Sequence, residues 1–234
     1  MNSGRILAIF QKDYKEFMRN MMLFTSVLIP IILALFFSRV GVSAGADMPN
    51  EIVTIMVGVV FSAVLFSSMM TMMAEENEKD TLRGLLQSPA TIIDIIIGKS
   101  MVVSLMTVIS LVASMFVMNV EGFWTIENSG GLLLLGIFFL NLGIGIGLIV
   151  KSVATTSVYL IPVMFIFGFT PYIEMIITDE DHIVRVVAEY LPLYQNYFIL
   201  NGEGDLSRFL ILAAWAAVSF VVVIWAFSMK KKDE

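Results

Sequence analysis

The 234-residue chain contains no cysteine and only one histidine, His182. Without cysteine it can form no disulfide, no thiolate metal site and no cysteine nucleophile. One histidine is too few for the usual zinc or haem ligand sets. The sequence therefore predicts no catalytic residue, no metal site and no cofactor bound by this chain itself.

Charged residues are also scarce, at 15% of the chain, where about 25% is usual for soluble domains. Hydrophobic residues make up 58%, and the mean hydropathy is +0.89. Uncharged runs such as 52–73 and 100–118 have about the length that a helix needs to cross a bilayer. We therefore predict an all-α integral membrane protein with one transmembrane domain over residues 1–234.

Six transmembrane helices are predicted from these runs. Their approximate bounds are 21–38, 52–73, 98–118, 132–150, 155–170 and 209–229. Pro30 and Pro162 lie inside the first and fifth, which membrane helices tolerate. The apolar pieces of 171–206 are each too short or too polar to cross, so this outer segment is predicted to form re-entrant or half-inserted helices.

Residues 4–20 show apolar side chains at every third or fourth position, with basic residues between them. This pattern predicts an amphipathic helix in the membrane interface, before the first span. The residues assigned to it are Phe10, Lys12, Tyr14, Phe17 and Arg19. The alternative is a basic lead-in that only sets topology, and the scattered basic residues argue against a cleavable signal peptide.

The positive-inside rule orients the six-span arrangement. With the N-terminus inside, only Arg39, Arg185 and Arg208 of the 14 Lys and Arg residues lie on the outer side. Both termini and the segment between spans two and three are therefore predicted to be cytoplasmic, in a multi-pass protein of the cell membrane. Lys99, at the inner end of span three, is expected to extend to the lipid headgroups.

The spans offer no obvious energy source of their own. Ion-driven transporters usually place ionisable residues at membrane depth, but spans one, two, four, five and six carry no charge between their ends. Their polar residues either hydrogen-bond between helices or line a substrate route. With two residues of the outer segment, the candidates for a translocation pathway are Ser67, Ser68, Asn141, Thr155, Ser157, Pro171 and Glu174. Active transport would therefore need a partner that supplies the energy.

Residues 73–99 carry a charge density that no hydrocarbon layer accepts, so the chain leaves the membrane between spans two and three. Leu82, Leu85 and Leu86 fall on one helical face, and Ser88-Pro89 ends the helix. This predicts a short amphipathic coupling helix over 79–89, which presents a surface to another protein.

The run from Glu76 to Pro89, followed by Gly98 and Lys99, resembles the cytoplasmic signature of type-two ATP-binding-cassette (ABC) permeases. The matching residues are Thr81, Leu82, Leu85, Leu86, Pro89, Gly98 and Lys99. Asp80 stands where glycine is usual and Arg83 where glutamate is usual, which bears on the charge pairing with a partner.

The resemblance implies the membrane subunit of a bacterial ABC exporter, with the lipid bilayer as its surroundings and no nucleic acid partner. Two permease chains, identical or not, would form the pathway, and two separate ATPase subunits would bind ATP and magnesium. The N-terminal helix and the coupling helix would receive the ATPase motion. The implied coupling residues are Glu78, Lys79, Asp80, Thr81, Leu82, Arg83, Gly84, Leu85, Leu86, Ser88 and Pro89.

An uncharged route favours an amphipathic peptide, a drug or another hydrophobic compound as the substrate. Two other functions remain open from the sequence. One is a non-transporting immunity or sensor subunit of the same fold, which would bind its ligand and signal. The other is a membrane enzyme, which the missing catalytic residues oppose.

Overall fold

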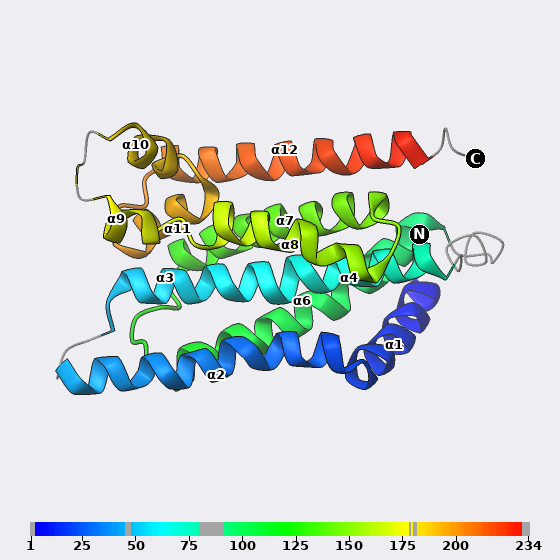
Figure 1. The fold of residues 1–234 in the computed structure, drawn as a ribbon, viewed down its shortest axis with the longest axis horizontal. Coiled ribbons are helices and arrows are strands. Elements are labelled where there is room, and N and C mark those ends of the chain that lie inside the picture. Colours follow the sequence, from blue (N-terminus) through cyan, green and yellow to red (C-terminus); the bar gives the residue numbers. More distant parts are fainter. Residues whose placement is uncertain (1–2, 45–47, 80–90, 178, 180–181, 231–234) are drawn as a thin grey trace.

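The computed structural model describes residues 3–44, 48–79, 91–177, 179 and 182–230. All regular elements within these residues are helical, and five helices are long and apolar enough to cross a membrane. These are Met21–Arg39, Asn50–Glu78, Ile93–Val117, Ile126–Ile149 and Leu206–Met229. They lie side by side in an elongated bundle (Figure 1). The predicted all-α membrane class is confirmed, while the complete six-span topology stays a prediction.

The predicted fifth span is a shorter helical run, Val153–Gly168. It consists of η2 (Val153–Thr155), α8 (Thr156–Val163) and the π-helical η3 (Met164–Gly168). At the α-helical rise its length is about 24 Å, which is less than the hydrocarbon core of about 30 Å. Pro162 lies in α8, and the backbone departs from regular α-helix soon after this residue, which lacks a donor.

One helical rod occupies the centre of the bundle, drawn in cyan in Figure 1. It runs through α3 (Asn50–Val59), η1 (Val60–Phe66) and α4 (Ser67–Glu78). Of its apolar window 89% is buried, against 22% for the first span, which lies in α2 (Met21–Ala44). The rod ends beyond residue 73, the predicted end of the second span, so the acidic residues that follow are still helical.

Glycines let the neighbouring helices approach this rod closely. An added Cβ on Gly143 of α7 (Ile126–Ile149) would lie 2.9 Å from the Phe66 carbonyl oxygen, and one on Gly147 would lie 2.7 Å from Met73 Cβ. Glycines four residues apart on one helix are typical of such close contacts. Gly58 of α3 meets Gly168 even more closely, since its added Cβ would lie 1.9 Å from the Gly168 carbonyl oxygen.

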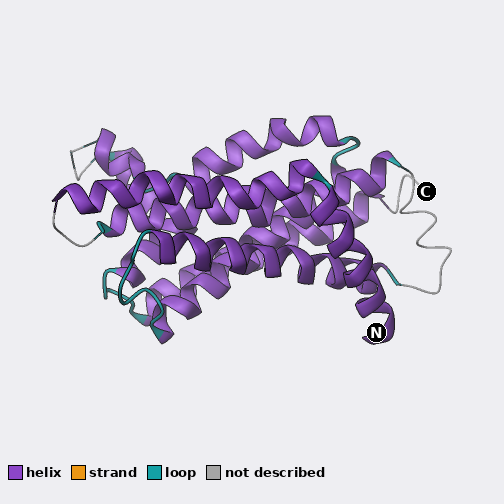
Figure 2. Ribbon diagram, turned by 90° about the horizontal axis from the view of Figure 1, so that it is seen from below, coloured by secondary structure: helices purple, strands orange, loops and turns teal. Residues whose placement is uncertain are grey.

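The remaining long helices flank the central rod. On one side α7 packs against α4 and against α12 (Leu206–Lys230), and on the other α6 (Ile92–Val117) packs against α2. The N-terminal α1 (Ser3–Arg19) packs on α6 and lies at an angle to the bundle, near the end of α4 (Figures 1 and 2). We refer to this end of the bundle as the α1 end.

The helix α6 begins at Ile92, earlier than the predicted residue 98. A capping box starts it, because the Thr91 hydroxyl accepts from the Asp94 amide and the Asp94 carboxylate accepts from the Thr91 amide, both at 3.2 Å. Such reciprocal bonds satisfy two free amides of a helix N-terminus. Gly98 and Lys99 therefore lie within α6 and not at its start.

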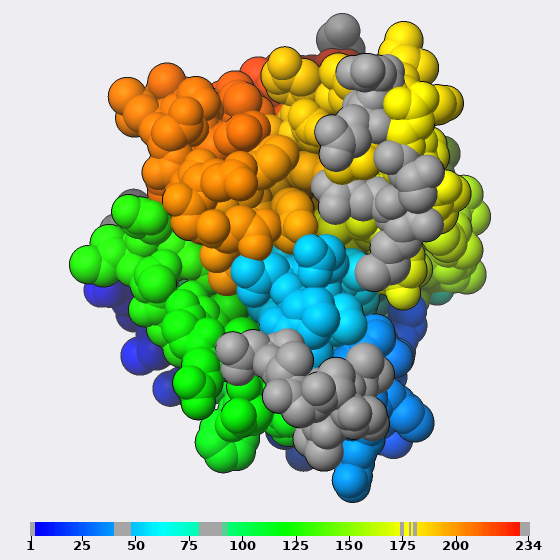
Figure 3. Space-filling model, turned by 90° about the vertical axis from the view of Figure 1, so that its left-hand side faces the viewer, coloured from blue at the N-terminus to red at the C-terminus, as the bar shows by residue number. Residues whose placement is uncertain are grey.

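Three short helices lie at the opposite end of the bundle, where re-entrant segments are predicted. They are α9 (Tyr172–Ile176), α10 (Ile183–Glu189) and α11 (Pro192–Leu200), each too short to cross a bilayer. Figure 3 faces this end, where the start of α3, the connection between α6 and α7, and the segment between α11 and α12 meet. Their depth in a membrane stays a prediction.

Neutral polar side chains fix these short helices in place. Trp215 Nε1 donates to the Tyr190 carbonyl oxygen at 2.7 Å, and Asn196 Nδ2 donates to Asn128 Oδ1 at 3.2 Å. Gln195 Nε2 donates to the carbonyl oxygen of Glu189. Two carbonyls at the break between α10 and α11, those of Glu189 and Tyr190, thus have side-chain donors as partners.

Candidate functional site

The predicted coupling helix can be followed only at its start. Glu78 and Lys79 are described, at the end of α4, where Lys79 forms an ion pair with Glu75 one turn earlier. Outside the described residues lie Asp80, Thr81, Leu82, Arg83, Gly84, Leu85, Leu86, Ser88 and Pro89. Their role as coupling residues stays a prediction. The described part of the site consists of the two helices that flank this segment, α4 and α6, and of α1.

Three buried charges from three helices meet between these flanks. The Lys99 ammonium of α6 lies 3.2 Å from Asp13 Oδ2 of α1 and 2.9 Å from Glu76 Oε1 of α4. Asp13 is 0% exposed, Lys99 2% and Glu76 6%. Charges buried this deeply need partners, because leaving water costs several kcal/mol per ion. Lys99 supplies the partner for both carboxylates and so joins α1, α4 and α6.

Lys12 lies at the solvent side of the same cluster. Its ammonium is 3.6 Å from Glu76 Oε1 and 3.7 Å from Asp13 Oδ1, so it balances the excess negative charge of the buried trio. Partial burial lowers the pKa of Lys12, but the carboxylates of Glu76, Asp13 and Glu16 outweigh it, and the pKa is raised above its ordinary value.

The close approach of α1 to α6 depends on a glycine. A Cβ on Gly98 would lie 2.6 Å from Ile9 Cγ2, so any larger residue would push α1 away. The Gly98-Lys99 pair therefore has a structural explanation, with the glycine admitting α1 and the lysine holding it. The expectation that Lys99 extends to the headgroups is wrong, because the side chain is buried between two carboxylates.

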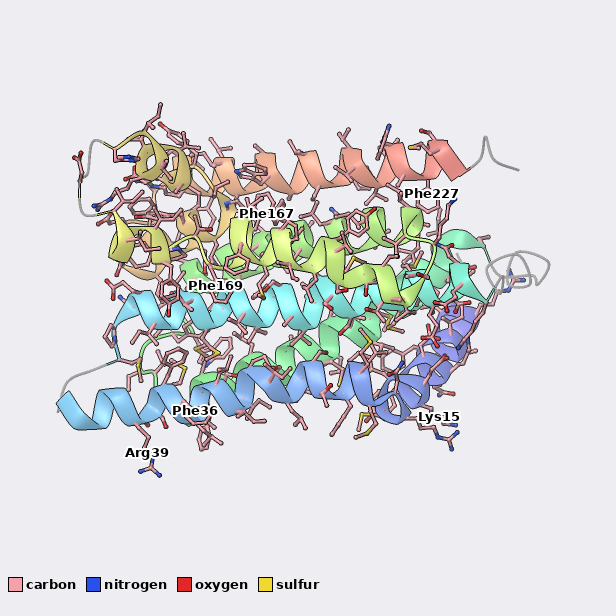
Figure 4. The ribbon with its side chains drawn as sticks, in the orientation of Figure 1. Lys15, Phe36, Arg39, Phe167, Phe169 and Phe227 are labelled. Atoms are coloured by element: carbon pink, nitrogen blue, oxygen red, sulfur yellow. The ribbon has the colours of Figure 1, made fainter. Side chains whose placement is uncertain are left out.

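The helix α1 docks on the bundle by one stripe of its surface. Its buried face runs through Ile6, Asp13 and Phe17. Tyr14, which the sequence placed among the apolar residues of the helix, is 38% exposed and stacks on Phe10. Basic side chains occupy the exposed side, which includes Arg19 and also Lys15, the latter pointing away from the bundle (Figure 4).

Asn77, the next residue after Glu76, holds the end of a different helix. Its Nδ2 donates to the carbonyl oxygens of Gly147, Leu148 and Val150 at 3.0, 3.1 and 3.0 Å. The last carbonyls of an α-helix have no partner within the helix. Asn77 therefore caps the C-terminus of α7 from the side.

Glu78 binds a third neighbour. Its Oε2 accepts from the Val153 amide at 2.7 Å, at the start of the η2–α8 run. A carboxylate there satisfies a free amide and lies at the favourable, positive end of the helix dipole. Three successive residues at the end of α4 thus contact α6, α7 and η2.

A cavity of about 220 Å³ opens beside the charge cluster. It is lined by Lys12, Glu16, Leu23, Met72, Glu75, Glu76, Lys79 and Lys99. Opposite charges alternate around it, and the described residues contain no group of three or more His, Asp or Glu residues that would hold a metal ion. This arrangement suits a joint between helices better than a catalytic centre.

The predicted pathway residues divide into two groups. Ser67 and Ser68 are buried, and Ser68 Oγ lies 3.1 Å from Ser26 Oγ of α2, while Asn141 Nδ2 donates to Ser219 Oγ of α12 at 3.3 Å. These two contacts join helices of the same chain. By contrast, Thr155 and Ser157 are exposed near the start of α8, and the bonds described for them are all local, to the Ser152 carbonyl and hydroxyl oxygens for Thr155 and to the Ala154 carbonyl oxygen for Ser157. Pro171 is buried before α9, and the Glu174 side chain lies outside the described residues.

Sequence reasoning missed Asp13 and the role of Asn77. Asp13 lies on the helical stripe that contains Ile6 and Phe17, so an acidic residue on an apolar face was the available signal. No comparable signal marks Asn77, whose bonds go to carbonyls far along the chain.

Comparison with known families decides the class of the protein. A family model described as ABC-2 family transporter protein matches residues 47–229, which is most of the chain. The chain belongs to the ABC-2 transporter family. No curated protein matches it closely enough to count as a relative. The resemblance seen in the sequence is therefore confirmed.

Membership of the ABC-2 family gives the structure its coarse function. ABC-2 chains are membrane-integral permease subunits without an ATPase site of their own, and the family implies an ABC ATPase as partner. The matched region of this ABC-2 chain includes Glu76, Asn77, Glu78 and Lys99, whereas Asp13 lies before it.

Proposed function

We propose that this chain is the permease subunit of an ABC exporter in the cell membrane, with both termini in the cytoplasm. It pairs with a second permease chain to form the translocation pathway. Two ATPase subunits bind ATP and magnesium, dock at the α1 end and drive the conformational change through the segment 79–89.

The observation that carries this proposal is the position of that segment. It follows directly from the most buried helical rod of the bundle and leads into α6, and buried ion pairs of Lys99 join the two flanks to each other and α6 to α1. A force applied between α4 and α6 therefore reaches the core of the bundle instead of being lost in a loose loop. Protein interiors are close-packed and transmit strain, which supports this use of the rod.

We place the route for substrate at the exposed face of α8. Exposed polar side chains are spaced along η2 and α8, among them Thr155, Ser157 and Tyr159, which an otherwise apolar lipid-facing surface would not need. A second permease chain opposite α8 would enclose these groups in a shared pathway. Ser68 and Asn141 would then stabilise helix contacts within each chain and would not touch the substrate.

The substrate proposed for this route is an amphipathic peptide, a drug or another hydrophobic compound. Exposed apolar side chains accompany the polar ones, among them Val158 and Ile161 on α8 and Phe165 on η3. The route has no described charge that would compensate an ion. Peptides or lipophilic drugs should stimulate ATP hydrolysis by the complex, and glycans or sodium should not. The opposite result would overturn the substrate assignment.

Co-purification of the ATPase tests the docking assignment. Arg83→Glu and Leu85→Asp should each abolish recovery of the ATPase with the tagged permease, while membrane insertion is unchanged. Arg39→Glu is the matched control, because Arg39 points away from the bundle far from the α1 end (Figure 4) and should leave the complex intact. Full recovery of the ATPase with both segment variants would refute the assignment.

A sensor or immunity subunit of the same fold is the other candidate. It would also bind an ATPase, so flux distinguishes the two. Inside-out vesicles that contain the wild-type complex should accumulate a lipophilic dye or a labelled amphipathic peptide when ATP is added. An intact complex that hydrolyses ATP but moves neither probe would favour the sensor.

A further inference from the structure

Glu76, Asn77 and Glu78 form what we call the junction, and each of them binds a different part of the bundle. Glu76 pairs with Lys99 of α6, Asn77 caps the end of α7, and Glu78 binds the first amide of η2. Lys99 extends the first contact to Asp13 of α1. The junction is the last described turn of α4 before the predicted coupling helix.

Helix geometry explains why three consecutive residues can do this. Successive side chains on an α-helix point about 100° apart, so three of them cover more than half of the circumference. A helix that ends in the middle of a bundle has neighbours on several sides, and here each neighbour offers the complementary group. Glu76 offers a carboxylate to an ammonium, and Glu78 offers a carboxylate to a free backbone amide. Asn77 offers an amide donor to helix carbonyls that have no partner within their own helix.

We propose that the junction is a coupling device that makes α1, α6, α7 and α8 move as one body with α4. Its three residues are positioning residues that act through the helix ends they hold. The inference rests on the proposed function, because it assigns to these contacts the distribution of the ATPase motion. It goes beyond that function by naming the contacts and the separate helices that each of them controls.

The contacts divide into independent arms. The α8 arm is the single bond between Glu78 and the Val153 amide, and a glutamine at position 78 would keep the accepting oxygen without the charge. The buried contact of the α1 arm is the pair between Asp13 and Lys99, and the half-exposed Lys12 of α1 adds a longer pair with Glu76. Removal of Asp13 leaves Lys99 paired with Glu76, so no buried ammonium is stranded. One arm can therefore be cut while the other stays whole.

Distances between spin labels test the arms directly, and the absence of native cysteine makes labelling specific. Label pairs are placed by cysteine substitution at exposed positions: Val158 on α8 with Ile137 on α7, and Leu7 on α1 with Ile137. Distances are measured in the purified permease and in its ATPase complex, with and without trapping by ATP and vanadate. In the wild type, both distance distributions should stay narrow and unchanged by trapping.

Each variant should then change only one of the two distance distributions. Glu78→Leu should broaden or shift the α7–α8 distribution only, Glu78→Gln should restore it, and Asp13→Leu should affect the α1–α7 distribution only. General loss of structure would broaden both distributions in every variant. Unchanged distances in Glu78→Leu and Asp13→Leu, equal broadening of both pairs, or relative movement of α7 and α8 in the trapped wild type would each overturn the proposal.

The two proposals fail in different ways. If no ATPase co-purifies with the wild type, the proposed function is wrong, whereas the distances in the permease alone still report whether the arms hold their helices. If the complex forms and exports but the arms are not selective, the junction proposal alone is wrong.

Discussion

The two ends of the bundle are held together by different chemistry. At the α1 end, buried ions from three helices make the contact, with Lys99 between Asp13 and Glu76. At the opposite end, the fully buried contact is neutral, between Asn196 and Asn128, and Trp215 binds the Tyr190 carbonyl oxygen, while charged side chains such as Glu51 and Arg208 take part only at partly exposed positions among the contacts described. Both ends are polar and both lie close to the limits of the apolar spans.

The difference concerns how each contact responds to movement. The attraction between two charges is inversely proportional to the distance between them, so an ion pair keeps part of its energy when the helices shift slightly. A neutral hydrogen bond weakens steeply with distance and angle, and it therefore fixes one geometry. The α1 end is thus suited to holding its helices together under load, and the opposite end to a single arrangement of its short helices.

The largest effect is expected from Lys99→Met. It would leave Asp13 and Glu76 buried without their cation, a loss of about 3–5 kcal/mol of stability. Thermal unfolding of the purified permease in detergent, followed by tryptophan fluorescence, measures this loss. The triple variant Asp13→Leu, Glu76→Leu, Lys99→Met should recover most of it, because apolar residues often replace buried ions without cost. A single variant as stable as the wild type would show that the cluster is not a buried ionic contact.

A smaller effect is expected from Asn196→Leu at the opposite end. It removes the donor to Asn128 Oδ1, which the fold keeps buried, at a cost of about 1–3 kcal/mol. Asn128 Nδ2 keeps its bond to the Phe123 carbonyl oxygen, so the local structure should hold. The same unfolding measurement applies. A loss as large as that of Lys99→Met would remove the contrast between the two ends.

The smallest effect is expected from Lys12→Gln, compared with Lys15→Gln as the control on the same helix. The Lys12 side chain is about half exposed, so its pairs should contribute about 1 kcal/mol at most. Because its folded pKa is raised, this contribution is complete below the ordinary value of 10.5 and is lost as pH rises through the raised pKa.

The pH dependence provides the measurement. The stability difference between wild type and Lys12→Gln should be constant from pH 7 to 9 and should shrink above 10.5. Lys15, which points away from the bundle, should show no comparable difference at any pH. A Lys12 difference that grows with rising pH would contradict the assigned pairing.

Much of the fold was predictable, because uncharged runs and helical periodicity are local properties of a sequence. The cores of the five long helices and the position of α1 follow from them. The helix α6 begins before the predicted span of 98–118, because the capping box of Thr91 and Asp94 starts it within the stretch predicted to be cytoplasmic. The close contact between Gly58 and Gly168 depends on which helices become neighbours, and local pattern does not determine that.

The site was predictable only in part for the same reason. The charges of 73–99 marked the place, and Gly98-Lys99 marked the family. Asp13, the α1 partner of Lys99, could not be predicted, because the role of a single acidic residue on the apolar stripe of an amphipathic helix depends on how the helix packs. Asn77 and Glu78 bind backbone atoms, and backbone carries no residue identity that a sequence could reveal.

The run from Val153 to Gly168 is held at both ends. The Glu78 carboxylate binds its first amide, and the backbone of Gly168, its last residue, packs directly against Gly58. The contact between the two glycines leaves almost no room for the helices to slide past each other, since it contains no side chain that could rearrange. Gly58 and Glu78 both belong to the central rod of α3, η1 and α4, so the run from Val153 to Gly168 is fixed to one rod at two points. Tyr159, between these points, would therefore move only with that rod, and the space beside it would widen or narrow with the displacement of the rod itself.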